Sequence, residues 1–227
     1  MVSVRVFAGE KGEPMGWEQT VEFVRAYFES HDPLGTDLSY RYPFRRRFDH
    51  CLRCSVWARR IASVEGGDVE LSATAALFHD IGKSAGESTQ DHGALGADIC
   101  DRYLDSVGYE KERRAVIVGI VARHSQHARH PEATLEEKIV SDADLIDETG
   151  AVAILWDTMA CALEPGPSCD RAYERSLRMT APTRVRLPGR LHTAEGKRIA
   201  QGRFAAVDAF LVNLAYELGR IETPTFI

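Results

Sequence analysis

An adjacent histidine and aspartate, His79-Asp80, lie at the centre of a set of residue types that could hold a metal ion. The other members of the set are His50, His92, His124 and Asp144. Imidazole nitrogens and carboxylate oxygens, with no thiolate among them, suit Mn, Fe, Co, Ni or Mg better than a closed structural zinc site. We therefore expect a catalytic site for chemistry at oxygen or phosphorus.

Four of these residues, His50, His79, Asp80 and Asp144, come from three different predicted helices. They would half-enclose one ion and leave positions for water and a substrate oxygen. An ion held there lowers the pKa of bound water and polarises a phosphoryl oxygen. His92 and His124 would complete a second metal site, with Asp80 bridging the two ions. We expect one or two divalent ions, which would fit either hydrolysis or oxygen activation.

Basic residues next to these ligands are candidates for binding a substrate phosphate, because phosphoryl charge needs cations around it. Lys83 follows the His-Asp pair, and Arg53 lies one helical turn after His50. We assign catalytic roles to Asp80, Lys83 and Arg53, and substrate binding to Lys83, Arg53 and Arg47. Arg47 ends the run Arg45-Arg46-Arg47, which would steer an anionic substrate or else form a solvated face.

Other polar residues have two interpretations. Asp147 and Glu148, one turn after Asp144, would orient ligands or accept a proton, or else be solvated or cap the next helix. Arg184, Arg186 and Arg190 would contact phosphate from a covering segment, or else be solvated. Cys51 and Cys54 are spaced as C-x-x-C, but core packing is favoured over zinc or redox use. Four further histidines are interpreted as surface residues: His31, His127, His130 and His192.

Helical periodicity dominates the chain and predicts an all-α fold. His50 shares a face with Cys54, Trp57 and Ile61, so it points where core residues point. Asp142 lies about 200° round its helix from Asp144, so the two cannot face one ion. The expected helices carry the apolar faces Trp17–Phe28, His50–Ile61, Val69–Asp80, His92–Tyr103, Ile117–His124, Thr134–Asp144, Ala151–Leu163 and Glu195–Leu218.

Two expectations concern the ends of helices and the segments between them. Gly82 is expected to stop the helix that begins after the N-cap Asp68, placing His79 and Asp80 on its last turn. The nearly apolar run Ala151–Leu163 predicts a buried helix. The stretch from Glu164 to Gly196, rich in Pro, Arg and Gly, predicts a looser segment that covers the site.

At 227 residues the chain is expected to form one domain, 1–227, with a core of about 44–165 and a C-terminal extension of about 166–227. Its formal charge of -6 argues against general nucleic-acid binding. An odd number of cysteines, 5, and no long apolar stretch at the N-terminus predict a cytoplasmic protein with free thiols. No segment approaches the roughly 18 apolar residues of a membrane span.

The order His, His-Asp, His, His, Asp on a helical bundle resembles the HD-domain superfamily of metal-dependent phosphohydrolases. His79-Asp80-Ile81-Gly82-Lys83 is similar to its HDIG form, and the resemblance covers about residues 44–165. It implies a helical fold and hydrolysis of a phosphate ester or anhydride, often in a nucleotide, by water that a metal activates. It also implies that His50, His79, Asp80 and Asp144 are the core ligands, whereas His92 and His124 match ligands of the two-metal branches.

The substrate is not identified by this resemblance. The chain has no GYP-type signature of cyclic dinucleotide phosphodiesterases and no synthetase module of the alarmone enzymes, so those substrates are disfavoured. The leading hypothesis is a phosphohydrolase whose partner is a small phosphorylated molecule such as a nucleotide, with no membrane partner and a homodimer left open. Bound iron and oxygen consumption would indicate a diiron oxygenase instead. A non-catalytic binding module would be indicated by a metal needed only for stability.

Overall fold

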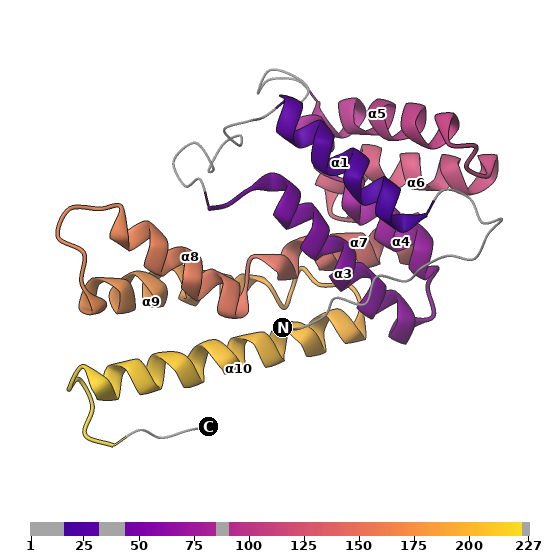
Figure 1. The fold of residues 1–227 in the computed structure, drawn as a ribbon. Helices are drawn as coiled ribbons and strands as arrows, with labels where there is room; N and C mark the ends of the chain where they lie inside the picture. The colour runs from indigo at the N-terminus through magenta and orange to yellow at the C-terminus, as the bar shows by residue number, and fades with distance from the viewer. Residues whose placement is uncertain (1–15, 32–43, 85–90, 224–227) are drawn as a thin grey trace.

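The computed structural model describes residues 16–31, 44–84 and 91–223. Within these ranges the secondary structure consists of nine α-helices and two short 3-10 helices, with no strand, which confirms the all-α prediction (Figure 1). The elements are α1 (Trp17–His31), α3 (Arg47–Glu65), α4 (Val69–Phe78), η1 (Ile81–Ser84), α5 (His92–Ser106), α6 (Lys111–Arg123), η2 (His124–Gln126), α7 (Leu135–Asp147), α8 (Gly150–Ala162), α9 (Cys169–Arg186) and α10 (Ala194–Glu217).

Capping residues set several helix ends, as the sequence predicts. The side chain of Asp68 accepts from a backbone N–H in the first turn of α4, and Asp91 does the same for α5. Thr134 and Glu137 form a capping box at the start of α7. Helix α3 ends at Gly66, which has a φ of 79° that glycine adopts without strain.

The core of the bundle surrounds α4. Every residue of α4 from Leu71 to Phe78 is buried. Helices α3, α6 and α7 pack against it, and α5 packs against α6 (Figure 1). Because α4 is enclosed, the His-Asp pair that follows it emerges from the interior of the protein.

Gly82 does not end helix α4, contrary to the prediction. Helix α4 ends at Phe78, so His79 and Asp80 follow the helix rather than forming its last turn, and Gly82 lies within η1. A Cβ atom at Gly82 would lie 2.0 Å from the carbonyl oxygen of His92 and 2.5 Å from the amide nitrogen of Gly96. The residue is therefore needed for the close approach of η1 to α5.

Helices α8, α9 and α10 form a second group beside the bundle (Figure 1). Helix α10 packs against α3 and α7 as well as α8 and α9. The prediction that Ala151–Leu163 is buried is wrong over much of its length, because Leu155 is 59% and Leu163 61% exposed. Apolar composition alone does not show whether other elements cover a helix.

The loose segment predicted from Glu164 to Gly196 is also partly wrong, because α9 occupies Cys169–Arg186. Ser168 caps it by accepting from the N–H of Arg171. Its only buried residue is Ser176, so it lacks the apolar stripe that identifies most helices in a sequence. Pro182, which usually argues against a helix, stands inside it.

Two contacts join α10 to α7. Asp142, which points away from Asp144 as predicted, accepts from the backbone N–H of His192 at 2.9 Å and of Thr193 at 2.8 Å. Arg203 donates through Nε to the Thr149 hydroxyl at 2.8 Å, and also to the Thr149 carbonyl. These bonds hold the C-terminal helices against the end of α7.

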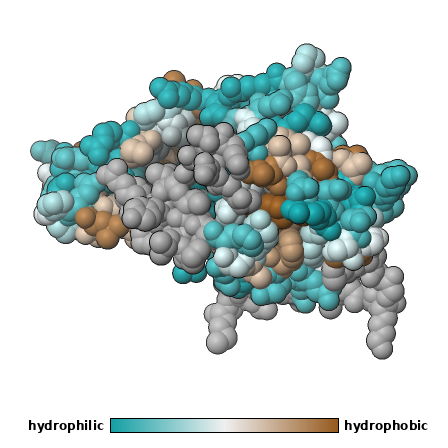
Figure 2. All heavy atoms as spheres, turned by 90° about the horizontal axis from the view of Figure 1, so that it is seen from above, coloured by the Kyte–Doolittle hydropathy of each residue, from teal (hydrophilic) through white to brown (hydrophobic). Residues whose placement is uncertain are grey.

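The face shown in Figure 2 is largely hydrophilic, with smaller hydrophobic areas between charged side chains. None of the helices in the described ranges has the length and apolar character that crossing a membrane requires.

Candidate metal centre

Three side chains from separate elements converge at the first part of the site. The Oδ1 atom of Asp144, on α7, lies 3.2 Å from Nε2 of His50, on α3. The same oxygen lies 3.7 Å from Nε2 of His79, which follows α4. The predicted convergence of these ligands is therefore present in the structure, and its spacing is that of groups able to surround one ion.

The second part of the site contains His92 and His124, whose Nε2 atoms are 3.2 Å apart. Asp80 lies between the two parts. Its Oδ1 is 3.2 Å from Nε2 of His124, while its Oδ2 is 3.6 Å from Nε2 of His79 and 3.8 Å from Nε2 of His50. One carboxylate thus faces both sets of imidazoles, which is the arrangement expected of a bridging ligand.

The imidazole rings are oriented by acceptors on their far sides. Nδ1 of His79 and Nδ1 of His124 each lie 2.7 Å from the carbonyl oxygen three residues earlier in the chain. Nδ1 of His50 lies 2.9 Å from Oδ2 of Asp147. With the proton on Nδ1, Nε2 of each ring presents a lone pair to the centre of the site.

Two buried polar atoms at the centre show whether the donor set fits a metal ion. Nε2 of His79 and Oδ1 of Asp80 are buried and have no hydrogen-bond partner among the described residues. The two residues are only 1% and 2% exposed. Buried polar atoms are rarely left unsatisfied, and both atoms are ones that a divalent ion takes as ligands. The donor set therefore fits a metal ion.

The charges of the site lead to the same conclusion. Burial lowers the pKa of His50, but the carboxylates of Asp144 and Asp147 outweigh it and raise that pKa to about 10. Burial opposes ionisation of Asp80 and Asp144, yet the neighbouring imidazoles hold both pKa values well below the usual range. The carboxylates thus require positive charge between them, which either protons on the imidazoles or metal ions supply.

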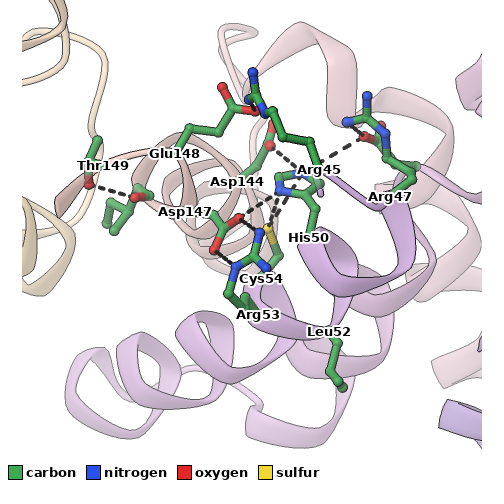
Figure 3. Close-up of polar contacts among 12 residues, drawn as sticks. Arg45, Arg47, His50, Leu52, Arg53, Cys54, Asp144, Asp147, Glu148 and Thr149 are labelled. Atoms are coloured by element: carbon green, nitrogen blue, oxygen red, sulfur yellow. Dashed lines mark hydrogen bonds and ion pairs between the residues drawn. The ribbon is translucent and has the colours of Figure 1, made fainter. Parts of the chain in front are cut away.

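Arg53 and Asp147 brace His50 from behind (Figure 3). Asp147 is fully buried and accepts from Nε and Nη2 of Arg53, both at 2.8 Å, in addition to His50. The ligand-orienting interpretation of Asp147 thus agrees with the geometry. Both of these Arg53 donors are engaged by Asp147 rather than directed to a substrate, so the predicted phosphate-binding role of Arg53 stays a prediction without support from this geometry.

The other predicted cations lie at the site. Nη1 of Arg47 and Nζ of Lys83 each donate to Oδ2 of Asp80 at 2.9 Å. Both line a cavity of about 420 Å³ together with His50, Asp80 and Asp144. We name this cavity the metal pocket.

Helix α9 and the residues just after it line one side of the metal pocket, which agrees with the expectation that the segment from Glu164 to Gly196 covers the site. Arg186 and Arg190 line it, and the buried Nε of Arg190 has no hydrogen-bond partner among the described residues. Arg184 instead forms an ion pair with Asp208, away from the pocket lining. Two of the three arginines considered for phosphate contact are therefore placed for it.

His127, interpreted from the sequence as a surface residue, lines the metal pocket, so that interpretation is wrong. Its Nδ1 is buried without a hydrogen-bond partner in the described structure and lies 3.9 Å from Oδ2 of Asp144. Its φ is 49°, in the left-handed region. A residue that has a side chain is strained in this conformation. Nε2 of His192 lies 2.8 Å from the carbonyl oxygen of His127 and supports this turn.

Cys54 lies closer to the ligands than the sequence suggests. It is fully buried, as predicted, and its Sγ is 3.6 Å from Nδ1 and 3.7 Å from Nε2 of His50. Burial raises the pKa of this thiol well above its usual value. Its Sγ also belongs, with atoms of His50, His79 and Asp144, to a group that lies close enough together to surround one ion.

Part of this chain matches a known protein family. The model of the HD domain matches residues 47–149. Ribonuclease Y of Cutibacterium acnes is 33% identical over 97 residues, which are 41% of this chain and 17% of that protein. Ribonuclease Y of Chloroflexus aurantiacus is 32% identical over 139 residues, 60% of this chain and 25% of that protein. The chain thus spans a quarter or less of the length of these relatives.

Solved structures share the fold over most of the chain. A predicted HD superfamily hydrolase from an uncultured Thermotogales bacterium superposes with a TM-score of 0.62 at 24% identity, covering 89% of this chain and 93% of that one. YpgQ of Bacillus subtilis, in complex with ADP, gives a TM-score of 0.56 at 21% identity, covering 87% of this chain and 97% of that one. The similarity covers more of the chain than the family match at residues 47–149 does.

Proposed function

Because this chain belongs to the HD-domain superfamily, we propose that it is a metal-dependent phosphohydrolase that cleaves a phosphate ester or anhydride of a small molecule, specifically a nucleotide. The observation that carries the proposal is the position of Asp80. One of its oxygens faces His50 and His79, the other faces His124, and two cations contact it. Such a site combines metal ligands with groups that attract phosphate.

The metal would be held by two sets of residues. His50, His79 and Asp144 would hold one ion, and His92 and His124 a second, with Asp80 shared between them. When bound, divalent ions supply activation of water and polarisation of a phosphoryl oxygen. Mn, Fe, Co, Ni and Mg are all compatible with this donor set.

The remaining residues of the pocket would bind and orient the phosphate. Arg47 and Lys83 would each exchange part of their contact with Asp80 for a phosphate oxygen once a metal ion neutralises that carboxylate. Arg190 would bind from the opposite wall, where its Nε lacks a hydrogen-bond partner among the described residues. Cations on both sides stabilise the charge that gathers on the transferred phosphoryl group.

A nucleotide is favoured over RNA as the substrate. The YpgQ structure was determined with ADP, a nucleotide, and shares the fold of this chain. The ribonuclease Y relatives match only part of this chain, and a formal charge of -6 opposes extended contact with a polyanion. RNA is therefore included in the test rather than in the proposal.

The test measures release of phosphate or pyrophosphate from a panel of nucleotides, phosphate esters and a short RNA, with Mn, Co, Ni, Fe or Mg added. The wild type is compared with Asp80→Ala. Asp98→Ala, which removes an exposed carboxylate of α5, serves as the matched control. Release that requires metal, persists in Asp98→Ala and disappears in Asp80→Ala is the expected result.

Absence of release from every compound would contradict the proposal. Iron retained through purification together with oxygen uptake would then indicate the oxygenase. Chelation that lowers the melting temperature without any activity to lose would indicate a binding module in which the metal is structural. Cleavage of RNA alone would keep the chemistry and replace the substrate.

A further inference from the structure

A second cavity, of about 350 Å³, lies next to the metal pocket. The two share Glu148, Thr149 and Thr183 in their walls. The second cavity is enclosed mainly by α8, α9 and α10, and we name it the side cavity. Its volume lies in the range of small-molecule sites.

The lining of the side cavity differs from that of the metal pocket. Phe44, Trp156, Met179 and Phe204 supply large apolar or aromatic surfaces. The guanidinium of Arg45 lies 4.3 Å from the centre of the Trp156 ring and is also ion-paired with Glu148, which limits its motion and balances its charge. These surfaces suit a flat, largely apolar group rather than a second phosphate.

One carboxylate in this lining provides a polar contact. Asp157, on α8, is only 7% exposed and lines the side cavity. Its Oδ1 lies 3.4 Å from Nε of Arg175, whose Nη1 also donates to Glu164 at 2.9 Å. An ionised carboxylate only accepts hydrogen bonds and has about four sites for doing so. It can therefore accept from a ligand N–H while keeping its contact with Arg175.

We propose that the side cavity binds the nucleobase of the substrate, and that Asp157 selects bases with an exocyclic amino group by accepting a hydrogen bond from it. This inference rests on the proposed function, because it places the phosphate of the same molecule in the metal pocket. The sugar would cross the shared wall at Thr149 and Thr183, whose hydroxyl groups are polar. The metal pocket then determines the reaction, and the side cavity determines which molecule undergoes it.

The simpler alternative is that Asp157 and Arg175 form an ion pair that serves only the packing of α8 against α9. In that case a neutral replacement of Asp157 changes stability and affects all substrates equally. Base selection requires an effect that depends on the base, so the two interpretations are separable by comparing substrates.

The first experiment uses two pairs of nucleotides that differ by one amino group. Guanosine is compared with inosine, and adenosine with purine riboside, each as the 5′-mono-, di- and triphosphate. We expect the wild type to favour the amino-bearing member of the pair that fits by tenfold or more in kcat/KM, about the effect of one hydrogen bond to a charged group. Asp157→Leu, which removes both acceptor oxygens, should reduce this preference to within about twofold, with hydrolysis of tripolyphosphate unchanged.

The second experiment blocks the side cavity without touching Asp157. Ala153→Phe adds a ring at a position that lines the cavity, and Ala151→Phe adds the same ring at an exposed position of the same helix. We expect Ala153→Phe to raise KM for nucleotides tenfold or more and to leave tripolyphosphate hydrolysis intact. Ala151→Phe should behave as the wild type.

Equal losses for nucleotides and tripolyphosphate, or no loss in Ala153→Phe, would overturn the inference while leaving the phosphohydrolase proposal in place. A preference that survives Asp157→Leu would overturn the role of Asp157. If the wild type hydrolyses none of the compounds, the proposed function fails first. Calorimetric binding of guanosine and adenosine diphosphates to the wild type and Ala153→Phe then decides the side cavity alone.

Discussion

Replacement of Asp147 by asparagine tests whether a buried carboxylate that would not contact the metal controls metal binding. Asp147 accepts three hydrogen bonds, one from His50 and two from Arg53, at 2.8 to 2.9 Å. An asparagine offers one oxygen and one NH₂ group in the same space. If the oxygen faces His50, the NH₂ group faces the donors of Arg53. If it faces Arg53, His50 must accept on Nδ1 and carry its proton on Nε2, where it cannot bind a metal.

Either orientation has a cost that can be worked out from these contacts. Loss of a carboxylate that orients a metal-binding histidine typically lowers metal affinity 10- to 100-fold, so we expect about that loss for Mn. Breaking a buried ion pair costs about 3 to 5 kcal/mol, and the partial exposure of Arg53, at 31%, places Asp147→Asn at about 2 to 3 kcal/mol. The two effects are measured by calorimetric titration with Mn and by urea unfolding in the presence of chelator.

Asp170→Asn is the matched control, because it neutralises an exposed carboxylate that also pairs with an arginine, Arg220. It should change neither quantity measurably. A folded Asp147→Asn protein with wild-type affinity for Mn would refute the argument that Asp147 positions His50. A loss of stability without a loss of affinity would leave it only a structural role.

Three further predictions concern single positions. Gly82→Ala should lower both the melting temperature and the metal affinity, because its Cβ would meet backbone atoms of α5. The control Gly202→Ala has open space around its Cβ and should raise the melting temperature slightly. Asp68→Ala should cost about 1 kcal/mol at pH 7 through loss of the cap. The hydrogen bonds from Arg113 lower the pKa of Asp68 despite partial burial, so its ionised form stabilises the protein above the unfolded pKa of about 4. That contribution is lost as the pH falls further, so urea midpoints of wild type and variant should converge in acid. His127→Gly should be more stable than His127→Ala by about 1 kcal/mol in thermal unfolding, because alanine keeps the strain of a positive φ. The two variants should lose activity to a similar extent.

The inward direction of three candidate ligands could be predicted from the sequence because His50, His92 and Asp144 each lie on a helix, whereas His79 and Asp80 follow α4. His50 and Asp144 follow the helical period of their own helices, so their inward direction is a local property. The capping box at the start of α7 is local as well. Residue type and spacing, together with the resemblance to the HD-domain superfamily, therefore select the six candidate ligands.

The features that were missed depend on contacts between distant parts of the chain. Whether Arg53 binds a substrate or a carboxylate depends on Asp147, which lies 94 residues away. The position of His127 in the pocket depends on a left-handed turn that His192 supports from another segment. Helix α9 is exposed on most of its surface, so its residues lack the pattern that burial imposes. None of these properties is local.

The family match ends at Thr149, between the candidate ligands and most of the wall of the side cavity. All six candidate ligands precede this residue, whereas Asp157, Arg175 and most of the wall of the side cavity follow it. An exchange of the helices after Thr149 between members of the superfamily, with Arg186 and Arg190 of the metal pocket retained, would therefore test whether the side cavity determines the substrate. Such a chimera would have to preserve the hydrogen bonds from Arg203 to Thr149, which connect the two parts of the chain.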